Sequence, residues 1–239
     1  MQRHSEVRFG NSTLCVAMAN KEKEVEMKRL KVRFTFTEPV LGTASNNREI
    51  HSEFIASHAP NAKSRDEEVA AIGVEESIEK SMTVFPRFDD GDIPMFWDYQ
   101  IKGFFKDTCS SLKRCKNQDY SKESCKMSAF KKVIDGCIFV EPRKIPIDMH
   151  GGSIGNLQRP LRGQTAQGER ISLANSETVP AGSTIDLTII CLADEHEKAV
   201  IEWLNYGTLR GLGQWRNGSY GRFEWDYIND DGRKLSKDD

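Results

Sequence analysis

A glycine- and arginine-rich segment near the C-terminus, residues 209–223, carries residue types suited to holding a polyanion. Its sequence, LRGLGQWRNGSYGRF, contains four glycines and three arginines, with Trp215 and Tyr220 between them. Glycine permits positive φ and lets a ligand approach bare N–H groups. Arginine presents a planar set of donors that matches phosphate, and an aromatic ring can stack on an unpaired base. The segment therefore predicts a site for a nucleic acid. The alternative is that the glycines only shape a turn and the arginines face water.

The elements around this segment place it between a helix and a strand. A helix that begins at Asp194 is expected before it, and the alternating residues Phe223, Trp225 and Tyr227 predict a strand after it. Backbone N–H groups in such a loop can converge on a phosphate. The residues expected to contact RNA here are Arg210, Gly211, Gly213, Trp215, Arg216, Gly218, Tyr220, Gly221 and Arg222.

Two further segments carry basic residues on predicted elements. Residues 98–114 predict an amphipathic helix, with Lys102, Lys106 and Lys113 on a face separate from the apolar one. Residues 30–37 alternate strictly and predict a half-buried strand whose polar face carries Lys31 and Arg33. Both sets are candidates for RNA phosphates. The alternative for both is an ordinary solvent-facing surface.

Composition excludes several classes of protein. The 239 residues carry a formal net charge of -2, so a nucleic-acid surface must be a local patch. No apolar run approaches 18 residues, which excludes a membrane span and predicts a cytoplasmic protein. The six cysteines form no C-x-x-C pair, and we expect reduced thiols. A partial metal site formed by Cys109, Cys115 and Cys125 is the minor alternative.

The chain divides into a folded domain and two tails. We expect a flexible tail at residues 1–26, one domain at residues 27–228 with an insertion at residues 44–97, and a charged tail at residues 229–239. Within the insertion, residues 44–82 predict helices and residues 83–97 predict a hairpin. Its turn, D-D-G-D, has three carboxylates that could hold a divalent metal, although a solvated tip is favoured. Residues 141–168 predict a long connection and residues 169–174 a short strand.

Without its insertions, the chain reads strand, helix, strand, strand, helix, strand. This order predicts an α+β fold of the ferredoxin-like (RRM-like) split βαβ type, with a helical insertion and a hairpin.

Three segments resemble motifs of the RAMP superfamily, which includes the RNA-binding backbone subunits of type III CRISPR effector complexes. Residues 100–106, Q-I-K-G-F-F-K, resemble the family's strand-to-helix segment I-P-G-S-S-L-K-G. Residues 177–189, E-T-V-P-A-G-S-T-I-D-L-T-I, resemble its signature E-x-V-P-A-G-T-x-F-x-F-x-I. Residues 211–223 resemble its C-terminal glycine-rich loop. Lys102, Phe104 and Phe105 stand where the first motif has small residues.

The resemblance implies an RNA-binding subunit that grips the sugar-phosphate backbone of a single-stranded guide RNA, with copies or other effector subunits stacked along it. It also implies a projecting hairpin, or thumb, for which residues 83–97 are the candidate. It requires no cofactor.

Two alternatives remain open. One is an endoribonuclease of the RAMP class, for which Mg²⁺ is a possible cofactor and the catalytic residue is unassigned. The other is a phage or mobile-element protein that mimics a backbone subunit and interferes with a CRISPR effector.

Overall fold

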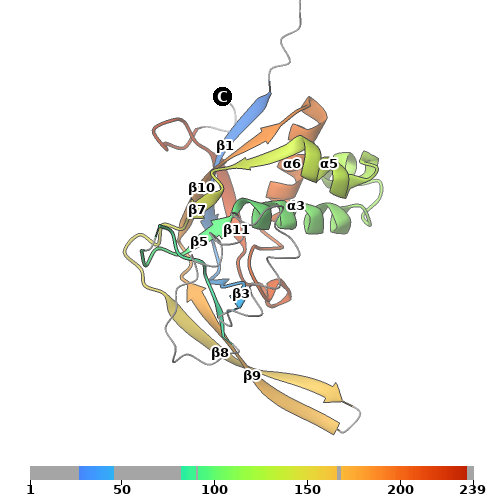
Figure 1. Cartoon of the computed structure of the whole chain (residues 1–239). Coiled ribbons are helices and arrows are strands. Elements are labelled where there is room, and N and C mark those ends of the chain that lie inside the picture. Colours follow the sequence, from blue (N-terminus) through green and yellow to red (C-terminus); the bar gives the residue numbers. More distant parts are fainter. Residues whose placement is uncertain (1–26, 46–81, 90, 166–167, 236–239) are drawn as a thin grey trace, which may run out of the picture.

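The computed structural model describes residues 27–45, 82–89, 91–165 and 168–235 (Figure 1). The predicted N-terminal tail and the helices predicted between residues 46 and 81 lie outside the described residues.

A four-stranded antiparallel sheet forms the centre of the molecule. Its strands are β1 (Lys28–Phe36), β6 (Ile138–Glu141), β10 (Thr184–Cys191) and β11 (Phe223–Tyr227), in the spatial order β11-β1-β10-β6. The alternation predicted for β1 is present, because Leu30, Val32, Phe34 and Phe36 are buried while the residues between them are not.

Helices cover one face of this sheet (Figure 1). They are α3 (Asp98–Leu112), α4 (Lys122–Lys126), α5 (Phe130–Cys137) and α6 (Asp194–Tyr206). Aromatic side chains join the layers: Phe34 stacks on Phe223 with ring centres 4.3 Å apart, and Phe105 of α3 lies 5.4 Å from Trp203 of α6. The prediction of an α+β protein is confirmed.

A second sheet carries a long hairpin that projects from the molecule (Figure 1). Its strands are β2 (Val40–Leu41), β3 (Ala44–Ser45), β4 (Thr83–Val84), β8 (Gly155–Thr165) and β9 (Gly168–Val179). β8 and β9 pair with each other along their whole length. The long connection predicted at residues 141–168 was therefore wrong over β8, whereas the short strand predicted at residues 169–174 is present as part of the longer β9. The sequence of β8 lacks apolar alternation, the signal that marks a strand packed on a core.

The hairpin predicted at residues 83–97 is present only in its inner part, because its two outer strands pair with other strands. β4 pairs with β3 and β9, whereas β5 (Met95–Trp97) pairs with β7 (Lys144–Pro146). The inner residues do fold back on themselves, through an antiparallel bridge between Arg87 and Pro94 and a hydrogen bond from Phe88 N to Ile93 O at 2.9 Å. Phe85 and Phe96 are buried in the main core, so the two flanking strands join different sheets.

The chain after β11 folds back instead of leaving the domain. Leu235 N donates to Tyr227 O at 2.8 Å, and Lys31 on the sheet forms an ion pair with Asp230. The predicted C-terminal tail thus begins with an ordered turn that extends to residue 235, and residues 236–239 lie outside the described residues.

The cysteines that the structure describes are free thiols. Burial raises the pKa of Cys109 to about 11 and that of Cys191 to about 12, so both stay protonated at neutral pH. Within the described ranges, no three His, Cys, Asp or Glu side chains are placed to hold a metal ion, which removes the alternative of a Cys109, Cys115 and Cys125 site. The part of the chain described here also contains no helix with the length and apolar character of a membrane span.

Candidate nucleic-acid interface

The glycine- and arginine-rich segment forms a compact loop, residues 207–222, between α6 and β11. It is tied to β1 and its neighbours by backbone hydrogen bonds: Thr37 N donates to Arg222 O at 2.9 Å, and Gly221 N donates to Pro39 O at 2.8 Å. We call it the glycine-arginine loop. Its arginine and aromatic side chains are thereby fixed relative to the core.

The predicted glycines have packing roles in this loop. A β carbon at Gly211 would lie 2.0 Å from the backbone of Gly221, and one at Gly221 (φ +71°) would lie 1.9 Å from Leu212 O. Gly213 (φ +81°) is similarly close to Leu41 O, at 2.7 Å. Because Gly221 N already donates to the chain, it is not free for a phosphate. This geometry favours the alternative that these glycines shape the loop.

Two of the predicted arginines share one carboxylate of α3. Arg210 Nε donates to Asp107 Oδ2 at 2.7 Å, and Arg216 Nη1 donates to the same oxygen at 3.0 Å. Arg210 Nη1 also donates to Asn217 Oδ1 at 2.7 Å. The hydrogen bond to Asp107 raises the pKa of Arg210 against the opposing effect of burial. Asp107, which the sequence analysis did not select, therefore holds both guanidinium groups beside α3.

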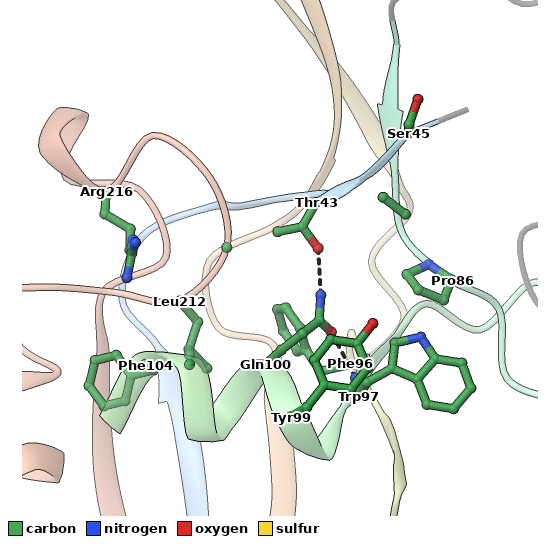
Figure 2. A pocket seen from close by; sticks show the side chains of 13 residues that line it. Thr43, Ser45, Pro86, Phe96, Trp97, Tyr99, Gln100, Phe104, Leu212 and Arg216 are labelled. Atoms are coloured by element: carbon green, nitrogen blue, oxygen red, sulfur yellow. Dashed lines mark hydrogen bonds between the residues drawn. The ribbon is translucent and has the colours of Figure 1, made fainter. Parts of the chain in front are cut away.

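A cavity of about 400 Å³ separates the glycine-arginine loop from the first turns of α3 (Figure 2). Within it, Gln100 Nε2 donates to Thr43 Oγ1 at 2.5 Å, and Gln100 Oε1 accepts from Trp97 N at 2.7 Å. The residues around it come from four separate parts of the chain: Thr43, Ala44, Ser45, Pro86, Phe96, Trp97, Tyr99, Gln100, Gly103, Phe104, Leu212, Gly213 and Arg216.

The helix terminus and Arg216 favour an anionic ligand in this cavity, whereas Asp98 in the first turn of α3 opposes one. The N-terminal turns of α3 contribute the positive end of a 15-residue helix. Arg216 also lines the cavity (Figure 2), with its guanidinium held 3.0 Å from the Asp107 carboxylate of α3. Gly103 leaves space in the helix wall, because a β carbon there would meet nothing within 4 Å. Arg216 and the N-terminal turns of α3 are the groups in this cavity that could interact with a phosphate.

The three predicted lysines of α3 point to its neighbours and not to this cavity. Lys106 forms an ion pair with Asp135 of α5 at 2.6 Å, and Lys113 Nζ donates to Met127 O at 2.6 Å. Lys102 Nζ donates to Asp135 O at 3.3 Å, and burial lowers its pKa. The structure therefore does not bring them together with the loop arginines.

Lys31 and Arg33 lie on the sheet face away from the helices, as predicted, but they meet carboxylates there. Arg33 Nε and Nη2 each donate to a carboxylate oxygen of Asp186 at 2.6 Å, and this pairing raises the pKa of Arg33. Lys31 is paired with Asp230. This face therefore carries mixed charge, and both of its predicted cations are already paired with carboxylates.

The two aromatic residues of the loop are stacked on each other. The rings of Trp215 and Tyr220 are nearly parallel, 16° apart, with centres 5.1 Å apart. Arg159 of β8 lies over Trp215, with its Cζ 4.0 Å from the ring centre. Gly218 packs against the same ring, and Nε of Arg222 is buried without a hydrogen-bond partner among the described residues.

Sequence analysis missed Thr43, Gln100, Asp107 and Arg159 as site residues. Each contacts a partner far away in the chain, so no local spacing could mark it.

Comparisons with known proteins found no matching family model and no matching curated protein. Solved structures that are similar include a chain of the type III-B Cmr-beta complex bound to cognate target RNA, at 11% identity and a TM-score of 0.41. That match covers 83% of this chain and 59% of the other. Cmr6 from Pyrococcus furiosus is similar at 11% identity and a TM-score of 0.41, covering 83% of this chain and 98% of that one.

A TM-score of 0.41 is too low to carry a functional assignment, which must come from the residues of this chain.

Proposed function

We propose that the chain is a sequence-tolerant RNA-binding subunit that grips the backbone of a guide RNA in a CRISPR-type ribonucleoprotein. The observation that carries this proposal is the cavity of about 400 Å³ between α3 and the glycine-arginine loop, which is lined by Arg216 and by the first turns of α3. A single-stranded backbone offers the anionic, repeating ligand that such a site suits.

The positions of the RAMP-like segments support the proposal. Residues 100–106 and residues 211–223 are more than a hundred positions apart, yet both line this cavity. Residues 177–189 connect β9 to β10, and Glu177 anchors that connection by accepting from Phe85 N at 2.8 Å and pairing with Arg87. Residues 100–106 and residues 211–223 therefore meet at one site, and residues 177–189 lead from β9 into β10.

The strand order of the central sheet also supports the proposal. With α3 between β1 and β6, and α6 between β10 and β11, the order β11-β1-β10-β6 is the one expected of a split βαβ unit. We infer a ferredoxin-like (RRM-like) domain.

We assign the role of projecting thumb to the β8–β9 hairpin in place of residues 83–97. It extends away from the domain (Figure 1), and its sequence carries Arg159, Arg162 and Arg170. A basic ribbon of this kind can reach the nucleic acid bound by a neighbouring subunit. Other copies of the chain or other effector subunits are the partners that this geometry suits.

The test is binding of a labelled single-stranded RNA to the full chain at a series of salt concentrations. We expect affinity to fall steeply with salt, and Arg216→Ala to reduce both affinity and the salt slope. Arg114→Ala is the matched control, because Arg114 is an exposed arginine at the far end of α3. Binding without salt dependence, or equal losses in both variants, would contradict the proposal. Incubation with and without Mg²⁺ in the same assay reports any cleavage.

A further inference from the structure

An arginine from the projecting hairpin lies on the exposed tryptophan of the glycine-arginine loop. Arg159 Cζ is 4.0 Å from the centre of the Trp215 ring, which is itself stacked on Tyr220. Trp215 has a left-handed backbone, φ 50°, and a β carbon at Gly218 would lie 2.9 Å from its ring atoms. The ring is therefore held in a defined place, and it links the hairpin to the loop.

The guanidinium of Arg159 is not satisfied in this position. Its Nε and Nη1 are buried and have no hydrogen-bond partner among the described residues. Burying a charged donor without an acceptor costs free energy, and contact with an aromatic face recovers only part of that free energy. Arg159 thus lacks an acceptor that a phosphate would provide.

Trp215 differs from the other tryptophans in its exposure. It is 43% exposed, whereas Trp97, Trp203 and Trp225 are 5% exposed or less. Its neighbour in sequence, Arg216, lines the cavity proposed for the RNA backbone. The accessible ring therefore belongs to the residue that directly precedes a lining residue of that cavity.

We propose that Trp215 is a stacking platform for a nucleobase of single-stranded RNA, and that the base replaces Arg159 on the ring. Arg159 then binds a phosphate of the same strand. Every base has a π face, so this contact adds affinity without reading sequence. The inference rests on the proposed function and extends it, because it names a base contact and a ligand-dependent link between the loop and the β8–β9 hairpin.

Tryptophan fluorescence tests the stacking directly, because Trp215 alone among the four tryptophans is accessible to acrylamide. The full chain is titrated with a single-stranded RNA and with an abasic strand of equal length and phosphate number. We expect RNA to protect the fluorescence from acrylamide and the abasic strand to bind without protecting it. Trp215→Leu should weaken binding of RNA by about 5- to 100-fold and leave binding of the abasic strand unchanged. Tyr120→Leu, at another exposed aromatic residue, is the control.

Arg159→Gln tests the exchange on the ring. We expect it to make Trp215 more accessible to acrylamide in the free protein and to lower the salt slope of RNA binding by about one. Equal binding of both strands by the wild-type chain, without protection, overturns the stacking proposal and leaves backbone binding intact. Binding of neither strand overturns both proposals. An unchanged salt slope in Arg159→Gln overturns the exchange.

Discussion

Gly211 and Gly221 lie back to back in the glycine-arginine loop, so close that a β carbon on Gly211 would be 2.0 Å from Gly221 C. The hydrogen bond from Leu212 N to Gly221 O, at 2.9 Å, fixes this approach. The two glycines close the loop at its neck and set the positions of the arginines and aromatic residues between them.

The first prediction concerns the stability of this neck. Gly211→Ala and Gly221→Ala should each lower the free energy of unfolding by about 1–3 kcal/mol or more, because the added methyl meets backbone that cannot rotate away. Thermal melting should show a fall of several degrees for each variant. Gly136→Ala is the matched control, since a β carbon at Gly136 in α5 meets nothing within 4 Å. Equal melting temperatures for Gly136→Ala and Gly211→Ala would contradict this packing role.

The second prediction concerns the carboxylate between the two arginines. Asp107→Asn removes a negative charge next to Arg210 and Arg216 and keeps the shape of the side chain. We expect RNA affinity at low salt to rise about two- to fivefold, because less repulsion acts on the phosphates. Stability should fall by about 1 kcal/mol through the weakened hydrogen bonds. A fall in affinity would instead show that Asp107 acts mainly by orienting the arginines.

The third prediction follows from the buried thiols. The folded-state pKa of Cys191 is raised to about 12, so above the ordinary thiol pKa the unfolded chain has lost a proton that the folded chain keeps. Stability therefore falls as pH rises from about 9 toward 12, by at most about 1.4 kcal/mol per pH unit for this group.

Urea unfolding at pH 8 and pH 10 measures this effect as a difference between variants. Cys191→Ala should be less stable than the wild type at pH 8 but lose less stability on going to pH 10. Cys115→Ala, at an exposed thiol, should follow the wild type. Parallel losses in all three proteins would exclude Cys191 as the source.

The elements that could be predicted from the sequence are those with a strong local pattern. The alternation of β1 and the apolar face of α3 both report burial against one core, and both were found as predicted. In the β8–β9 hairpin, β8 was missed and β9 was predicted only as a short strand, because a two-stranded ribbon that projects from the domain needs no apolar face. Residues 83–97 had a strong turn signal, but buried aromatic residues on either side send the two strands into different sheets.

Only part of the candidate site could be predicted, because here too the sequence reports local patterns and not long-range contacts. Residue type identified the arginines, glycines and aromatic residues of one loop, because they are contiguous in sequence. Their partners could not be predicted. Asp107 lies 103 residues before Arg210, and the periodicity of a helix does not indicate which acidic side chain pairs with which arginine. The lysines of α3 show the opposite case. They share one face of the helix, as predicted, but that face lies beside α5 and away from the glycine-arginine loop.

The fourth prediction separates binding at the cavity from stability. Gly103 lies inside α3 with negative φ, it lines the cavity, and a β carbon there would meet nothing within 4 Å. Gly103→Ala should therefore stabilise the protein by about 0.5–1 kcal/mol, because alanine is the better helix former. The same methyl would occupy space in the cavity that the proposed RNA backbone needs, so RNA affinity should fall while the melting temperature rises.

Gly136→Ala makes the equivalent change in a helix away from the cavity and should leave RNA affinity unaltered. If Gly103→Ala binds RNA as tightly as the wild type, the backbone does not pass through this cavity, whatever the effect on melting.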